Sequence, residues 1–323
     1  MHILKELFLY QQQSSNNFAY TDAGAATLAA ADLIQVAKGS TIDHEISMEP
    51  VELVAAGFDQ YSAVVGKFGA KGSLKFLMNP ASGGGLVLPQ WAKVMQGSCD
   101  YSLAATTAGT VPSNWLLSPA STPTLSGMLD HYSGDLASGA SLRARYYNLK
   151  GSFKIASEAN KVPTIDFAID GAFYSEIDST QPDVTSSKVR ENPFTLKGLT
   201  ILVLGSSLYS VTSFEFDGGE VVVNRNDISQ TGGAGQSDIT DRKIKVSLKC
   251  YAVKHATVDP LTALQNDTEG VISVTWGSGT KAIRLAGTYF QITERKKADE
   301  NGITAFDIKG QLNQNNFVVG INA

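Results

Sequence analysis

Residues 164–171, TIDFAIDG, and residues 303–310, ITAFDIKG, alternate between apolar and polar side chains and share the pattern Phe-x-Ile-x-Gly. A period of two places apolar side chains on one face of a β-strand and polar side chains on the other. One packed face and one wet face are typical of strands in an antiparallel sheet. The two stretches therefore predict a β-rich fold, and their likeness suggests that the chain contains two related halves.

The likeness extends outward from these two strands. Upstream, residues 72–76 (GSLKF) resemble residues 246–250 (VSLKC), and each run is followed by an apolar segment led by Pro89 or Pro260. Proline is favoured in the first turn of a helix, so each of these segments predicts a short helix. Each half then has a long strand pattern before its final strand. The order strand, helix, strand, strand is therefore the same in both halves.

This repeat predicts two tandem domains, 1–180 and 194–323, joined by a polar linker at 181–193. The helix prolines are 171 residues apart and the Phe-x-Ile-x-Gly patterns 139 apart, so the first half holds 32 more residues between helix and final strand. These residues form an insertion near 98–140, whose Ser, Thr, Ala, Gly and Pro content predicts an exposed loop or small excursion. We expect the first domain also to carry an N-terminal strand or arm.

The composition of the 323 residues limits what the chain can bind. Its formal net charge is −5, whereas a protein that holds duplex DNA by neutralising phosphates is basic, so contact with nucleic acid should be non-adhesive. Only 18% of the residues are charged, which suits either surface hidden between copies or a β-rich protein that exposes Ser, Thr, Asn and Gly. The sequence has no apolar run long enough to span a membrane and no secretory signal pattern, so we expect no membrane contact.

Residue types used in catalysis and metal binding are scattered along the chain. The four histidines lack a second ligand at helical spacing, and the glycine runs lack the Lys-Ser/Thr of a phosphate-binding loop. Cys99 and Cys250 are far apart, which predicts free buried thiols instead of a disulfide framework or a zinc site. We therefore expect no enzyme activity, no catalytic or cofactor-binding residues, no metal and no cofactor.

Several motifs occur in an order that resembles the major tail tube proteins of long-tailed, siphovirus-like bacteriophages, in their duplicated-domain form. The resemblance covers nearly the whole chain and depends on the order of the motifs more than on any one of them. Its elements include LKELFLY at 4–10, GAKGSLKF at 69–76, PQWAKVMQGSC at 89–99, LKGSFK at 149–154, VPTIDF at 162–167 and TSFEFD at 212–217.

The resemblance implies two tail-tube-type β-sandwich domains, each with a short flanking helix, whose inner sheets join those of neighbouring copies into a multi-chain β-barrel. Three chains would form a pseudo-hexameric ring. With about four strands per domain, about twenty-four strands at roughly 4.8 Å spacing and about 40° tilt give a barrel about 48 Å across. Such rings would stack into the tail tube, the conduit for DNA ejection.

The same resemblance implies partners and a location. The chain would contact itself, the tail tip and tape measure proteins and the tail terminator protein, while genomic DNA passes without specific binding. It would be located in the virion tail, and in the host cytoplasm during assembly. Asp166 and Asp307, on the polar faces of the two quoted strands, are candidates for an acidic or neutral lumen.

Residues 218–241 are long and polar for a hairpin turn and contain the glycine-rich run 232–235. A surface loop without regular structure is one interpretation. An arm that orders only against the next ring is the other, because a tube needs an axial contact that closed barrels do not supply. The candidate inter-ring residues carry charges of both signs and are Arg225, Asp227, Asp238, Asp241 and Arg242.

Two other classes of function fit a β-rich chain. The main alternative is a two-domain β-sandwich binding or adhesin module of a virion or cell surface, and an enzyme is the other. Electron microscopy of the purified protein separates these interpretations, because a tube subunit predicts rings or tubes whereas a binding module predicts discrete particles.

Overall fold

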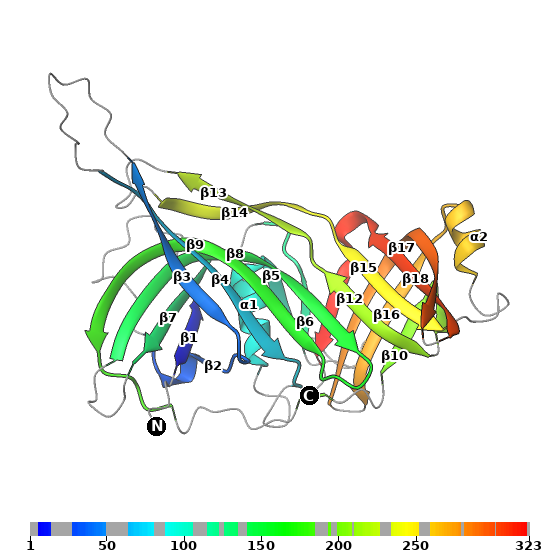
Figure 1. Ribbon diagram of the computed structural model, residues 1–323, viewed down its shortest axis with the longest axis horizontal. Helices are drawn as coiled ribbons and strands as arrows, with labels where there is room; N and C mark the ends of the chain where they lie inside the picture. The colour runs from blue at the N-terminus through cyan, green and yellow to red at the C-terminus, as the bar shows by residue number, and fades with distance from the viewer. Residues whose placement is uncertain are drawn as a thin grey trace, which may run out of the picture.

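The computed structural model describes the chain in segments. Seventeen strands form one sheet whose assigned pairings are antiparallel, and two further strands form a separate hairpin (Figure 1). The prediction of a mainly β fold with short helices is therefore confirmed, while the tandem sandwich domains and the multi-chain barrel stay predictions. The described residues are 6–13, 28–49, 64–80, 88–105, 115–122, 126–134, 141–184, 193–194, 199–208, 210–226, 234–251, 259–278, 281–300 and 302–321.

Strands of the first half pair in the order β3–β4–β9–β8–β7–β1–β2. Helix α1 packs against this sheet, mainly on β1 and β8. The alternation in β9 is as predicted, since Ile165 and Phe167 are buried between exposed or half-buried neighbours. The elements are β1 (Leu7–Gln12), a 3-10 turn (Ala30–Asp32), β2 (Leu33–Ile34), β3 (Thr41–Glu49), β4 (Val64–Leu77), α1 (Gln90–Ser98), β5 (Tyr101–Ala105), β6 (Trp115–Pro119), β7 (Gly127–Ser133), β8 (Ser141–Glu158) and β9 (Thr164–Ser179).

Strands of the second half pair in the order β12–β15–β18–β17–β16–β10–β11, which repeats the order of the first half strand for strand. The corresponding helix, α2, packs against β17. The elements are β10 (Thr200–Val203), β11 (Ser206–Leu208), β12 (Val211–Asp217), β13 (Glu220–Asn226), β14 (Ala234–Arg242), β15 (Lys245–Tyr251), α2 (Pro260–Gln265), β16 (Glu269–Ser278), β17 (Lys281–Glu300), β18 (Ile303–Leu312), a 3-10 turn (Asn313–Asn315) and β19 (Phe317–Ile321).

The strand registers show that two alignments of the repeat differ. Lys75 on β4 lies opposite Asp166 on β9, and Lys249 on β15 lies opposite Asp307 on β18. When the GSLKF and VSLKC strands are aligned, the two aspartates correspond, and this alignment differs by two residues from the one that matches the Phe-x-Ile-x-Gly patterns. Two residues are one full strand period, so this shift leaves the apolar and polar faces unchanged.

The two halves share one continuous sheet. Residues 154–158 of β8 pair with residues 213–217 of β12, so eight strands run in the order β3–β4–β9–β8–β12–β15–β18–β17 (Figure 1). A second connection between the halves is the pairing of β6 with β19. Neither of these strands has a counterpart among the described residues of the other half. The insertion near 98–140 therefore contains a small β5–β6 hairpin with a fully buried Leu117, and is not simply an exposed loop.

An aromatic cluster fills the junction between the halves. Its members are Tyr101 on β5, Phe153 on β8, Phe216 on β12 and Phe317 on β19. Ring centroids are 5.5 Å apart for Tyr101 and Phe153, and 4.4 Å apart for Phe216 and Phe317. Burying a side chain of this kind contributes about 1.5–3 kcal/mol, so the halves share a substantial apolar core. The domain boundary at 181–193 stays a prediction, since most of that segment lies outside the described residues.

Candidate functional site: the charged sheet face and the hairpin base

The polar face of the eight-stranded sheet carries a row of alternating charges. Along this row, Lys75, Asp166, Lys154, Asp217 and Lys245 lie opposite one another on five successive strands. The Nζ atom of Lys75 is 3.5 Å from Asp166 Oδ1, and that of Lys154 is 3.1 Å from Asp217 Oδ2. The hydrogen bond to Asp217 raises the pKa of Lys154. Exposed ion pairs contribute about 0–1 kcal/mol each, so their main effect is to favour one strand register over another.

Both candidate lumen residues lie on this face. Asp166 is part of the row just described and lies between two lysines. On β18, Gln311 lies opposite Lys245 and so continues the row. Asp307 is four residues from Gln311 on the same strand, and side chains an even number of residues apart lie on the same face. It lies opposite Lys249 on β15 and Lys296 on β17. Each aspartate is thus flanked by cations, so the face is balanced in charge at these positions; its assignment to a lumen stays a prediction.

Within residues 218–241, residues 220–226 and 234–241 belong to a hairpin in the single chain. Strands β13 and β14 pair with one another and lie over the first half, in contact with β8 and β9 (Figure 1). The turn into β13 requires glycine at Gly219, where φ is +62° and a Cβ atom would lie 2.1 Å from the carbonyl oxygen of Lys243. The prediction of an arm that orders only against the next ring is therefore wrong for β13 and β14, while the tip between them lies outside the described residues.

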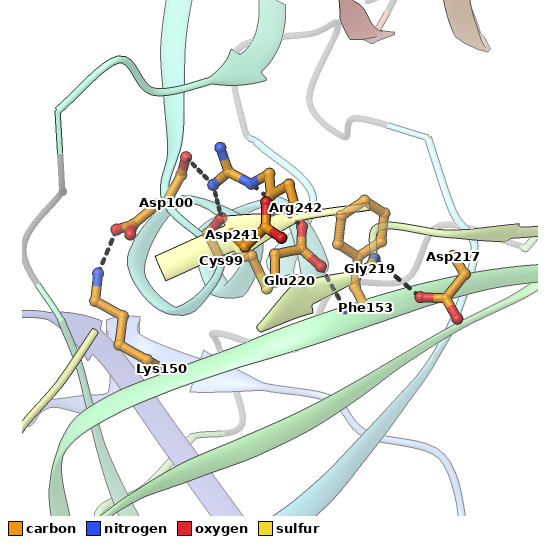
Figure 2. A network of polar contacts seen from close by, with 9 residues as sticks. All are labelled: Cys99, Asp100, Lys150, Phe153, Asp217, Gly219, Glu220, Asp241 and Arg242. Atoms are coloured by element: carbon orange, nitrogen blue, oxygen red, sulfur yellow. Dashed lines mark hydrogen bonds and ion pairs between the residues drawn. The ribbon is translucent and has the colours of Figure 1, made fainter. Parts of the chain in front are cut away.

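The structure separates the five candidate inter-ring residues. Arg225 and Asp238 pair across the hairpin, with Nε 2.5 Å from Oδ2. Asp241 is exposed, and Asp227 lies outside the described residues. Arg242 is directed into the first half of the same chain (Figure 2). An inter-ring role stays a prediction for these residues, but Arg242 already has a contact within the chain.

Arg242, at the base of the hairpin, binds the C-terminal end of α1 (Figure 2). Its Nη2 atom donates hydrogen bonds to the carbonyl oxygens of Cys99 at 2.6 Å and of Asp100 at 2.8 Å. Its guanidinium carbon also lies 5.0 Å from the centroid of the Tyr101 ring. A cation is favourable here because the last carbonyl groups of a helix have no partner within the helix. The second half thus caps a helix of the first half.

Glu220 completes the hairpin base. It lies opposite Arg242, with Oε1 3.7 Å from Nε, and its Oε2 accepts a hydrogen bond from the Phe153 amide at 3.4 Å. Burial raises the pKa of the Glu220 carboxyl to about 7, against the lowering effects of backbone hydrogen bonds and Arg242. Burial also raises the pKa of the Cys99 thiol and of the Tyr101 hydroxyl, so both stay neutral. Glu220 is therefore the group at this junction that titrates near neutral pH.

Two buried ion pairs lie along β8. The Lys150 ammonium contacts the Asp100 carboxylate and donates to the Gly97 carbonyl at 3.4 Å. Arg145 and Asp130 form a bidentate pair in which both distances are 2.6 Å. Removing one member of such a pair is costly because the other charge stays buried without compensation. Sequence reasoning missed these residues; the available signal was a lone charge in an apolar strand pattern, such as Asp130 within GMLDHYS.

The remaining residues with potential chemistry are dispersed. Among the described residues, no group of three or more His, Cys, Asp or Glu side chains could hold a metal ion. Cys99 and Cys250 are free and buried, which confirms that prediction. No helix in the described part of the chain is long and apolar enough to cross a membrane. Comparison with known proteins finds no matching protein-family model and no matching curated protein.

Proposed function

We propose that this chain is a structural virion protein that polymerises as stacked rings into the tail tube of a long-tailed bacteriophage, the conduit for DNA ejection. One observation carries the proposal. The eight-stranded sheet takes four strands from each half, and within the described residues β3 and the last part of β17 each pair on one side only. An open strand edge is a template for pairing with another chain, so copies that join by these edges would extend the sheet around a ring.

The strand count sets the size of such a ring. Three copies with eight strands each give a barrel about 48 Å across, at roughly 4.8 Å spacing and about 40° tilt. Side chains of about 5 Å on each side leave an opening wider than the roughly 20 Å of a DNA duplex. A homotrimer is favoured because the two halves have the same pairing order, which makes a ring of three chains pseudo-hexameric.

The charged sheet face suits a channel through which DNA slides. Lysines of the row lie next to carboxylates, so a phosphate group must compete with ion pairs that already exist. The net charge of −5 adds long-range repulsion between the assembled ring and DNA. Genomic DNA would therefore pass without specific binding. The tail tip, tape measure and tail terminator proteins as partners, and a location in the virion tail, belong to the same proposal.

Electron microscopy of the concentrated purified protein tests this proposal. We expect rings or tubes, and image classification should show three chains per ring with quasi-sixfold symmetry. Six chains per ring would contradict the trimer. Discrete particles at every concentration would instead favour a two-domain β-sandwich binding or adhesin module.

A further inference from the structure

The chain contains an internal example of how two repeats join. On β8, β7 pairs along residues 142–149, and β12 then takes the same side of the strand along residues 154–158. On β17, β16 pairs along residues 281–291, but no described strand follows on that side along residues 292–300. The last part of β17 is thus the second-half equivalent of the β8 edge that β12 occupies.

The complementary edge belongs to β3, at the other end of the eight-stranded sheet (Figure 1). Strand β3 corresponds to β12, because β3 pairs with β4 and β12 pairs with the corresponding strand β15. Among the described residues β3 pairs with β4 alone, so the side that β12 presents to β8 is open on β3. One copy therefore exposes both edges of a junction that it already contains once.

Lys296 is the second-half equivalent of Lys154. On β8, Lys154 lies opposite Asp166 on one side and opposite Asp217 on the other. On β17, Lys296 lies opposite Asp307, the residue that corresponds to Asp166. The other side of Lys296 is the open edge, where a neighbouring strand would supply the counterpart of Asp217.

Asp43 is the first-half equivalent of Asp217. Asp217 lies opposite Lys245 on β15, and Asp43 lies opposite Lys71 on β4. Lys71 and Lys245 coincide when the GSLKF and VSLKC strands are aligned. The open side of Asp43 is therefore the place for a lysine that corresponds to Lys154.

We propose that the open edge of β17 pairs in antiparallel fashion with β3 of a second copy of this chain, with Lys296 opposite Asp43. The inference rests on the proposed ring and adds its residue register. Lys249, Asp307 and Lys296 of one copy, followed by Asp43 and Lys71 of the next, then alternate in charge in the same way as the row within the chain. The interface between copies repeats the junction between halves.

Charges separate the proposed register from one of its two nearest alternatives. Shifting β17 by two residues, one strand period, places Glu294 opposite Asp43 in one direction, which brings like charges together, and Ala298 opposite Asp43 in the other, which brings Lys296 opposite Glu45. In the proposed register Glu294 faces Glu45, but Glu294 contacts Lys296 and Lys309 of its own chain, the latter at 2.9 Å. The match of Lys296 with Lys154 and of Asp43 with Asp217 therefore selects the proposed register over the one with Ala298 opposite Asp43.

Charge reversal tests the pair of residues. Lys296→Glu alone, or Asp43→Lys alone, should raise the protein concentration needed for ring assembly by about tenfold or more, because like charges then face one another at each interface of the ring. The double variant should assemble at close to the wild-type concentration. Lys161→Glu, an equal change at an exposed lysine in the β8–β9 turn, is the control and should assemble normally. A double variant that assembles no better than the single variants, while its circular dichroism spectrum matches wild type, would overturn the pair.

Cysteine cross-linking fixes the register independently. Residues directly opposite on antiparallel strands are close enough for a disulfide, so oxidising the Lys296→Cys, Asp43→Cys variant should give covalent trimers on a denaturing gel. The Ala298→Cys, Asp43→Cys variant, which tests the register shifted by two residues, should not, and wild type gives the background, since Cys99 and Cys250 are buried. Rings in wild type with cross-links in the Ala298 variant alone would overturn this register and leave the proposed function standing. If neither rings nor cross-links form at any concentration, the register and the proposed function are both overturned.

Discussion

Helices α1 and α2 occupy corresponding places in the two halves, yet they are held in different ways. Helix α1 buries seven of its nine residues, Trp91 among them, and its C-terminal carbonyl groups bind Arg242 from the other half. Helix α2 has six residues, buries Pro260 and Ala263, and has its N-cap at Asp259. Tertiary packing therefore holds α1, whereas a local cap contributes much of what holds α2. Of two copies of one element, one has become part of the core and depends on the opposite half.

Trp91 gives the largest expected difference between the two helices. Its side chain is fully buried, and its indole Nε1 donates to the Asn79 carbonyl at 3.2 Å. Trp91→Ala leaves a large cavity and should lower the free energy of unfolding by about 3–5 kcal/mol. The control is Leu261→Ala on α2, whose side chain is 39% exposed and whose loss should cost less than about 1 kcal/mol. Urea denaturation followed by circular dichroism measures both, and equal losses would refute the contrast.

Glu220 makes the support of α1 dependent on pH. Its pKa is about 7 in the folded protein against an ordinary value of 4.5, so between these values the folded state binds more protons than the unfolded chain. Stability should therefore fall as pH rises from about 4.5 to about 7 and level off above, by on the order of 3 kcal/mol in total. Glu220→Gln should remove this decline. Urea midpoints between about pH 4 and about pH 8 test it, and curves that run parallel for variant and wild type would exclude Glu220 as the cause.

Arg242 lies at the base of the hairpin and Arg225 lies farther out on it. Comparing substitutions at the two positions shows which part of the hairpin stabilises the first half. Arg242→Met removes two hydrogen bonds to the end of α1 and the cation beside Glu220, and should cost about 2 kcal/mol. Arg225→Met removes an ion pair whose arginine is largely exposed, and should cost about 0–1 kcal/mol. Thermal unfolding at neutral pH compares the two, and the idea of a supporting base fails if Arg225 proves the more costly loss.

Local pattern was sufficient to predict the parts of this fold that depend on neighbours in sequence. Alternation identified the buried face of β9, and the two prolines marked the starts of α1 and α2, although Pro89 precedes its helix and Pro260 lies within it. The buried free thiols followed from the separation of Cys99 and Cys250. In each case the deciding property is a period, a cap or a spacing that a single strand or helix carries by itself.

Contacts between distant residues could not be predicted in this way. The sequence could not show that the two alignments of the repeat differ by two residues, because a strand shifted by one period buries the same face. Arg242 was predicted as a candidate inter-ring residue, since nothing near it in sequence shows that it donates a hydrogen bond to the carbonyl oxygen of Cys99, 143 positions earlier. The Arg145–Asp130 pair was missed for the same reason, because its members meet only through the β7–β8 register. Charge rows and caps of this kind become visible once the strands are paired.

Asp259 gives the smallest expected effect and completes the comparison of the helices. Its Oδ1 accepts hydrogen bonds from the amides of Leu261 and Thr262, both at 3.1 Å, and its Oδ2 accepts one from the Thr262 hydroxyl at 2.6 Å. Asp259→Ala removes these acceptors and should cost about 1 kcal/mol, whereas Asp259→Asn keeps an amide oxygen and should cost less. Because α2 is short and half exposed, its loss should remain local, so amide hydrogen exchange should quicken in α2 and stay unchanged in α1. Faster exchange in both helices would mean that α2, like α1, belongs to the cooperative core.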